Sequence, residues 1–232
     1  DRENPRMALK TSTTRRTFLG RLAGVAGACA VPCAVPASAL GRAGRPAAGD
    51  RITLGVIGLG HRNRSNLPHF LAQADVQCVT VCDCFADRRA MGKKIVDDHY
   101  DNTDCTTTRF HEDLLDRADI DALLIATGDR WHSVLSVAAA KAGKDVYCEK
   151  PFSLTVAEGR RQVDVTKRYG TVWQCGTQRR SNGWYAFVAN LVRQGGIGKL
   201  RTITAVLGGW CGNGVAKPEP EPDPAVFDYH RW

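Results

Sequence analysis

The sequence predicts an α/β fold: a Rossmann-type doubly wound parallel sheet, followed by the start of a second α+β domain. Two observations predict the sheet. An apolar, β-branched run ends in a glycine-rich turn at 52–60, and after it short apolar runs alternate with helix-forming segments as far as residue 175. Farther along, the proline-rich acidic stretch at 217–224 predicts an extended loop.

The first expected strand, Ile52–Ile57, is apolar enough to be buried on both faces of a parallel sheet. It leads into Gly58-Leu59-Gly60-His61-Arg62-Asn63, a G-x-G-x-x-G turn with Asn63 in place of the third glycine. The first glycine allows a tight turn, and the second lets the backbone approach a pyrophosphate. A helix beginning near His61 would point its N–H groups at the phosphates, and Asn63 would only widen the helix–strand spacing. A glycine turn without a ligand is the alternative interpretation.

A carboxylate follows the second expected strand. The apolar run Val76–Val81 leads to Asp83, where this fold places the group that hydrogen-bonds a ribose 2′-hydroxyl. Because a carboxylate repels a 2′-phosphate, Asp83 favours NAD over NADP, while Arg88 and Arg89 on the next helix weaken that preference. A polar residue that merely caps the strand end is the alternative for Asp83.

The later segments continue the alternation. We expect a helix over 86–99, a buried strand over 121–126, an alanine-rich helix over 133–142 and a further strand from 146. Ligands of such sheets bind at the carboxyl ends of the strands, so Thr127 is expected on the same edge as the glycine turn.

The segment Glu149-Lys150-Pro151 stands where the next strand leaves the sheet, on that same edge. Lysine is a useful base only if desolvation or a neighbouring positive charge lowers its pKa, and the nicotinamide ring of NAD carries such a charge. Pro151 keeps Lys150 out of helical geometry and so fixes the direction of its stem. Glu149 is expected to pair with the lysine or with a backbone donor. Without this position, the tripeptide would be interpreted as an exposed loop.

Together these motifs resemble the glucose–fructose oxidoreductase, inositol dehydrogenase and rhizopine-catabolism family, Gfo/Idh/MocA. The resemblance covers about residues 51 to 210 and is carried by 54–63, 126–132, 138–154 and 174–181. It implies that Lys150 lies beside the nicotinamide and assists proton transfer, and that Ala126 and Thr127 line the dinucleotide. Trp131 and His132 match a pair expected near the nicotinamide end, whereas Gly128 replaces the proline of the family's A-T-P segment.

We therefore expect an NAD-dependent oxidoreductase that transfers hydride between nicotinamide and a sugar, cyclitol or related polyol. The expected catalytic residues are Lys150 and His132, although a helix N-terminal histidine without a catalytic part is an alternative for His132. The expected cofactor-binding residues are Gly58, Gly60, His61, Arg62, Asn63, Asp83, Ala126, Thr127, Trp131, Glu149, Lys150 and Gln178. Two alternatives stay open: an NAD-dependent glycoside hydrolase of the same family, and a dinucleotide-binding product without activity.

The resemblance also implies a second domain that covers the cofactor, carries further acid–base residues and forms oligomers. We expect only its beginning here, with a helix over 184–194, a strand over 200–207 and His230 in a loop, so that the chain is C-terminally truncated. The expected domains are a signal peptide over 1–39, a linker over 40–50, an NAD(P)-binding domain over 51–175 and a partial substrate and oligomerisation domain over 176–232.

The N-terminal residues predict an export signal. Thr14-Arg15-Arg16-Thr17-Phe18-Leu19 matches a twin-arginine signal, and Ala37-Ser38-Ala39 offers small residues for cleavage. Low hydrophobicity and the prolines at 32 and 36 argue against a lasting membrane span. We expect export by the twin-arginine translocase into a bacterial periplasm, with the cofactor loaded beforehand. An uncleaved leader or a lipid on Cys29 that anchors the chain in the membrane is the alternative.

Charge and cysteine content argue against a nucleic-acid-binding protein, a metal site and a disulfide framework. The net charge of +8 falls once residues 1–39 are removed, because the remainder carries 26 Lys/Arg against 22 Asp/Glu, a net +4. With no run of basic and aromatic residues, nucleic acid is not an expected partner. None of the nine cysteines forms C-x-x-C, and those at 78, 82, 148 and 175 fall in expected buried strands. Neither a metal site nor a disulfide framework is expected.

Overall fold

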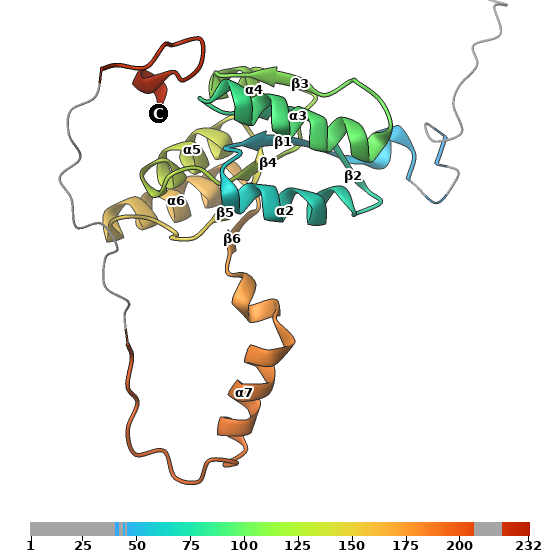
Figure 1. Cartoon of the computed structure of the whole chain (residues 1–232). Coiled ribbons are helices and arrows are strands. Elements are labelled where there is room, and N and C mark those ends of the chain that lie inside the picture. The colour runs from blue at the N-terminus through green and yellow to red at the C-terminus, as the bar shows by residue number, and fades with distance from the viewer. Residues whose placement is uncertain (1–39, 42–43, 45, 207–219) are drawn as a thin grey trace, which may run out of the picture.

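The computed structural model describes residues 40–41, 44, 46–206 and 220–232 (Figure 1). Those residues form one layered α/β body, from which helix α7 (Gly183–Arg193) projects away from the sheet. The predicted leader over 1–39 lies outside the described residues. In the part of the chain that is described, no helix is both long enough and apolar enough to cross a membrane.

Six parallel strands form the sheet in the order β3-β2-β1-β4-β5-β6. The chain builds outward from β1 to β3, returns to the other side of β1 and then builds outward to β6. This reversal places a crevice between β1 and β4 at the carboxyl end of the sheet, where ligands of doubly wound folds bind. The strands are β1 Ile52–Ile57, β2 Val76–Cys82, β3 Thr106–Thr108, β4 Ala122–Ile125, β5 Asp145–Glu149 and β6 Trp173–Gly176. The predicted Rossmann-type fold is confirmed.

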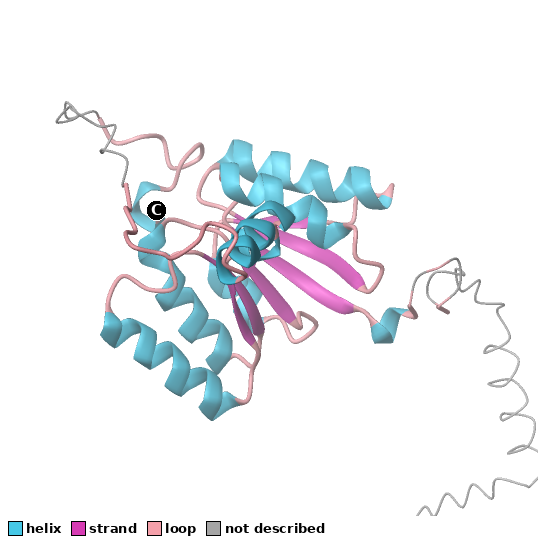
Figure 2. Ribbon diagram, turned by 90° about the horizontal axis from the view of Figure 1, so that it is seen from below, coloured by secondary structure: helices cyan, strands magenta, loops and turns pink. Residues whose placement is uncertain are grey.

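Helices cover both faces of the sheet (Figure 2). Because successive strand residues point to opposite faces, β4 sends Leu124 into one core with α2 and α3, and its neighbours Leu123 and Ile125 into another with α4 and α5. The helices are α2 His61–Leu71, α3 Ala86–Tyr100, α4 His111–Asp116, α5 Asp129–Lys141 and α6 Val156–Tyr169, and short 3₁₀ turns are η2 Ala48–Asp50, η3 Gln178–Ser181 and η4 Tyr229–Arg231.

Two predicted elements differ from the structure. Helix α5 begins at Asp129, four residues before the expected start, because the extended backbone of Gly128 serves as its N-cap. The strand predicted over 200–207 is wrong for residues 200–206, which form no strand in the described structure. Its β-branched residues Ile203 and Val206 are 79% and 85% exposed, so β-propensity had no neighbouring strand to pair with.

Candidate functional site

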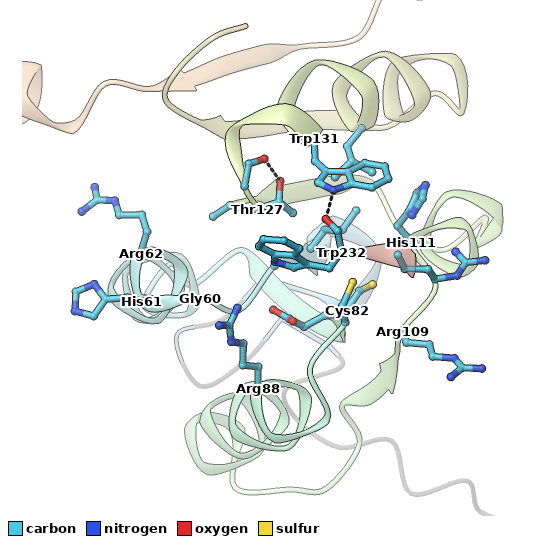
Figure 3. A pocket seen from close by; sticks show the side chains of 18 residues that line it. Gly60, His61, Arg62, Cys82, Arg88, Arg109, His111, Thr127, Trp131 and Trp232 are labelled. Carbon is cyan, nitrogen blue, oxygen red and sulfur yellow. Dashed lines mark hydrogen bonds between the residues drawn. The ribbon is translucent and has the colours of Figure 1, made fainter. Parts of the chain in front are cut away.

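A cavity of about 440 Å³ opens at the carboxyl ends of β1, β2 and β4, beside the crevice where the strand order reverses (Figure 3). This size lies within the range of about 300 to 1,000 Å³ that is usual for ligand pockets. The cavity brings together eight of the residues that the sequence predicted for the cofactor, namely Gly58, Gly60, His61, Arg62, Asp83, Ala126, Thr127 and Trp131.

Glycine is needed at the two positions of the turn for different structural reasons. Gly58 has φ +85°, and a Cβ there would lie 2.6 Å from the main-chain oxygen of Ala126, so no other residue fits. Gly60 has an ordinary φ of −64°, and an added Cβ would meet only the Arg88 guanidinium, at 3.9 Å. Gly60 therefore leaves open space at the cavity, as a backbone that a pyrophosphate approaches closely must.

The start of α2 supplies donors for an anion. Gly60 is the N-cap and offers no side-chain hydrogen bond, so the N–H groups of the first turn have no side-chain cap. The positive end of the helix dipole and the nearby guanidinium groups of Arg62 and Arg88 favour negative charge at the same place. The turn, the open glycine and the cationic lining fit the diphosphate of a dinucleotide.

Asn63 does not line the cavity, contrary to its predicted cofactor-binding role. Its side chain is fully buried, and its Nδ2 donates to the main-chain oxygen of Gly58 at 2.5 Å. The residue that replaces the third glycine thus closes the turn from behind, through a bond that glycine lacks.

Asp83 fastens the glycine turn to the end of β2. It is only 8% exposed; its Oδ2 accepts from the Leu59 N–H at 2.6 Å and its Oδ1 from the Phe85 N–H at 2.9 Å. Since each carboxylate oxygen accepts more than one bond, Asp83 retains acceptor capacity toward the cavity. Arg89 donates to the main-chain oxygen of Asp83 at 2.7 Å, so this bond to the backbone fixes the position of the Arg89 guanidinium.

Glu149, also predicted to contact the cofactor, is instead a buried junction between three segments. Its side chain is 3% exposed, and its Oε1 accepts from Asn66 Nδ2 at 2.7 Å and from Arg62 Nε at 3.0 Å, both on α2. The same oxygen accepts from Gln178 Nε2, and Oε2 accepts from the N–H of Lys150 at 3.2 Å. Gln178 is therefore also a supporting residue outside the cavity lining. The junction ties the phosphate helix to the strand that carries Lys150.

The junction makes stability depend on pH. Burial by itself raises the pKa of Glu149, but the hydrogen bonds from Asn66 and Arg62 outweigh burial, and the pKa lies below its ordinary value. A depressed folded-state pKa stabilises the fold above the ordinary carboxyl value of about 4.3, and this contribution is lost as the pH falls through the folded value.

We expect Glu149→Gln to lower the free energy of unfolding at pH 7 by about 1 to 3 kcal/mol, because the charge-assisted bonds weaken. Arg62 is 46% exposed, so solvent screening limits its share. Urea denaturation at pH 7 and again near pH 3.5 checks this: the gap between wild type and variant should narrow at the lower pH. A gap of constant size would show that the carboxylate charge does not hold the junction.

His132, predicted as a catalytic residue, is 1% exposed and lies outside the cavity lining. Its Nδ1 is 2.9 Å from the main-chain oxygen of Pro151, and its Nε2 has no hydrogen-bond partner among the described residues. A buried imidazole bonded to a backbone oxygen positions the segment that follows Lys150. Because the described side chain makes no contact with the cavity, nothing in this geometry supports a catalytic part for His132, and that role stays a prediction.

Lys150 stands at the cavity edge of the sheet, one strand beyond Thr127. Because Ile125 is paired with Cys148, Thr127 and Lys150 leave their strands at the same level. The Lys150 side chain is exposed and forms no ion pair with any described residue, and the Lys150–Pro151 peptide is cis. The structure thus places Lys150 on the predicted edge, beside the cavity rather than in its lining.

Sequence reasoning missed part of the lining. Arg109 and His111, around the start of α4, and Arg231 and Trp232, at the far end of the sequence, all line the cavity. The aromatic side chains within 227–232 were the available signal, but in this segment the sequence analysis interpreted only His230, as a loop residue.

Two buried cysteines, Cys82 and Cys148, are poor nucleophiles. Burial raises the pKa of Cys82, and it raises the pKa of Cys148 to about 12, so both thiols stay protonated near neutral pH. Across the residues that the structure describes, no cluster of His, Cys, Asp and Glu side chains could hold a metal ion.

The model of the Gfo/Idh/MocA family, described as an oxidoreductase family with an NAD-binding Rossmann fold, matches residues 52–177. The myo-inositol 2-dehydrogenase of Thermotoga maritima is 30% identical over 180 residues, which cover 77% of this chain and 48% of that protein. A glycosyl hydrolase family 109 protein of Shewanella baltica is 30% identical over 210 residues, covering 80% and 44%. The chain spans about half the length of these curated relatives.

Solved structures share the fold. Myo-inositol 2-dehydrogenase from Lactobacillus plantarum superposes with a TM-score of 0.56 at 26% identity, over 64% of this chain and 43% of that one. Scyllo-inositol dehydrogenase from Lactobacillus casei, solved with NAD(H) and scyllo-inositol, gives 0.55 at 24% identity, over 64% and 42%. At that identity the second comparison bears on the fold alone.

Proposed function

The chain belongs to the Gfo/Idh/MocA oxidoreductase family, whose Rossmann fold binds NAD, and on this premise we propose that it is an NAD-dependent dehydrogenase of a sugar, cyclitol or related polyol. One observation carries the proposal. The cavity at the glycine turn and the exposed Lys150 share the carboxyl edge of the sheet.

Different residues of the cavity bind different parts of the dinucleotide. The open backbone at Gly60 and the first turn of α2 receive the diphosphate, and Asp83 accepts a ribose hydroxyl. Ala126 and Thr127 line the wall that leads toward Lys150. NAD, when bound, supplies the acceptor for the hydride of the substrate.

Lys150 is the proposed base. A polyol loses a hydroxyl proton as its carbon is oxidised, and an exposed lysine at the sheet edge can take that proton directly or through a relay. Glu149 acts through the backbone: its Oε2 accepts the N–H of Lys150, so it fixes the lysine without touching the substrate. His132 holds the next peptide unit from the other side.

The names of relatives direct the choice of substrates, because the Thermotoga maritima protein and the Lactobacillus plantarum structure are both inositol dehydrogenases. The test is NADH formation by the intact protein with NAD and a panel of myo-inositol, scyllo-inositol and aldoses. We expect saturable NADH formation with at least one cyclic polyol or sugar. NADH binding without turnover across the panel would favour the alternative of a dinucleotide-binding chain without activity.

A second candidate is an NAD-dependent glycoside hydrolase, because the Shewanella baltica relative covers 80% of this chain. In that case the protein would cleave an aryl glycoside and form no net NADH, since the cofactor is reoxidised within each turnover. Measuring released phenol and NADH in one reaction separates the two activities.

We further propose the domain and export assignments. Residues 1–39 are a twin-arginine signal that delivers the protein to the periplasm, 40–50 a linker and 51–175 the NAD-binding domain. Residues 176–232 belong to a substrate and oligomerisation domain; the large apolar side chains exposed on α7, Trp184 at 68% and Phe187 at 55%, support a surface that is covered in the assembly. Retention in the cytoplasm after replacing Arg15 and Arg16 with lysine tests export, and sedimentation tests the oligomer.

A further inference from the structure

The described C-terminal residues, drawn in red, return to the α/β body near α4 and α5 (Figure 1), and Arg231 and Trp232 among them line the cavity. Phe227 forms an antiparallel bridge with Phe85 in the loop after β2. Two main-chain bonds flank the bridge: the Ala86 N–H donates to the Val226 oxygen at 2.9 Å, and the Asp228 N–H donates to the Cys84 oxygen at 3.2 Å. The segment is therefore fastened to the end of β2, one wall of the crevice.

Aromatic packing strengthens this attachment. The rings of Phe85 and Phe227 stack with centroids 3.9 Å apart and planes 6° apart. The Arg88 guanidinium lies 3.9 Å from the Phe85 centroid. Stacked aromatic pairs stabilise a contact beyond the area they bury, so Phe227 is the anchor of the segment.

Charged contacts fix the same segment to α4 and to the loop just before it. Arg231 donates to both carboxylate oxygens of Glu112, at 3.0 and 2.9 Å, and Asp228 lies 3.7 Å from Arg109. Each ion pair is partly exposed and weak by itself. The contact of Arg231 with both oxygens of Glu112 nevertheless fixes the orientation of the C-terminal segment relative to α4.

The other wall of the crevice holds Trp232. Its main-chain oxygen accepts from Trp131 Nε1 at 2.8 Å and from an Arg130 guanidinium nitrogen at 2.6 Å, both on α5. The Arg130 guanidinium also lies 4.2 Å from the Trp232 ring centroid. Figure 3 shows the Trp232 indole among the lining side chains, close to Trp131. Residues 226–232 thus bridge the crevice from β2 to α5.

We propose that residues 226–232 form a clamp across the dinucleotide cavity, in which Trp232 contacts the bound cofactor and Phe227 anchors the segment. The proposal rests on NAD binding as proposed above. The cavity has a volume of about 440 Å³ with the clamp in place, so the clamp forms part of the cavity wall and does not fill the cavity. Trp232 is 50% exposed, which leaves indole surface for a planar ring to stack on. The clamp retains the dinucleotide by slowing its departure.

The test is stopped-flow measurement of NADH binding to the intact protein. Trp232→Ala removes the stacking surface, and Phe227→Ala removes the anchor. We expect each variant to raise the dissociation rate and the Kd of NADH about tenfold, which corresponds to about 1.4 kcal/mol. Trp232→Ala loses a stacking contact with the cofactor, and Phe227→Ala releases the segment that carries Trp232. Trp184→Ala on α7 is the matched control, and it should leave both constants unchanged.

Glu112→Gln provides a variant on the protein surface that weakens the clamp without touching its aromatic core, and its melting temperature should match wild type. We expect it to raise the dissociation rate by a smaller factor than Phe227→Ala. Unchanged constants in all three variants would overturn the clamp. Tighter NADH binding in them would show that the segment competes with the cofactor, which also overturns it. If the wild type binds no NADH, the proposed function fails and the clamp with it.

Discussion

Gly58→Ala is expected to abolish NADH binding and to lower the free energy of unfolding by about 2 to 5 kcal/mol. The backbone has φ +85°, which costs an alanine about 1 to 2 kcal/mol. The new Cβ would also lie 2.6 Å from the Ala126 oxygen and 2.9 Å from Thr127 Cγ2, and such overpacking adds about 1 to 3 kcal/mol. To relieve the contact, the turn must move away from β4, and the cavity between them changes shape. Urea denaturation and NADH titration measure the two effects.

Gly143→Ala is the control that separates the cost of a positive φ from the cost of the steric clash in Gly58→Ala. Gly143 has φ +74°, but nothing lies within 4 Å of its added Cβ. This variant should therefore show only the conformational cost of about 1 to 2 kcal/mol and should bind NADH normally. Wild-type NADH affinity in Gly58→Ala would contradict the placement of the dinucleotide at this turn.

Lys150→Ala is expected to reduce kcat on the polyol substrate by about 10²- to 10⁴-fold, the usual contribution of a general base. The Kd of NADH should stay close to wild type, because Lys150 lies outside the cavity lining. Steady-state kinetics together with NADH titration distinguish loss of proton transfer from loss of cofactor.

Lys150→Arg retains the positive charge but not the base, since a guanidinium does not deprotonate in proteins. We expect it to be nearly as inactive as Lys150→Ala. Lys141→Ala, a change at an exposed lysine at the end of α5, is the matched control and should keep full activity. A Lys150→Arg variant with wild-type kcat would assign Lys150 an electrostatic role instead of proton transfer.

Local sequence patterns predicted the sheet and the turn because the forces involved are local. Buried parallel strands need continuous apolar runs, and the turn at 58–60 needs glycine for a positive φ and for close approach. These constraints also placed Asp83 and Lys150 on one edge, since every parallel strand ends there. The resemblance to a known family supplied the polyol chemistry, which no pattern of burial specifies.

Contacts between distant segments were not predictable in the same way. Glu149 and Gln178 carry polar side chains beside a motif and were assigned to the cofactor, yet they bond to each other. The sequence around His132 looks the same whether its side chain faces a ligand or a buried carbonyl. Trp232 reaches the cavity through pairing between residues 85 and 227, which lie more than a hundred positions apart. Only the folded chain reveals such pairs.

The central claim is that a dinucleotide lies against the backbone at Gly60. Gly60→Ala tests it most directly, because an alanine adopts φ −64° freely and its Cβ would meet only the Arg88 guanidinium at 3.9 Å. The protein should fold as the wild type does, so any change in binding reports the ligand itself.

The measurement is the Kd of NADH for wild type and Gly60→Ala, with melting temperatures recorded on the same samples. The structure predicts one NADH site in the wild type, an unchanged melting temperature without ligand, and a Kd at least about tenfold higher in the variant, corresponding to about 1.4 kcal/mol. Equal NADH affinity in the two proteins, or no binding to either, would contradict the claim.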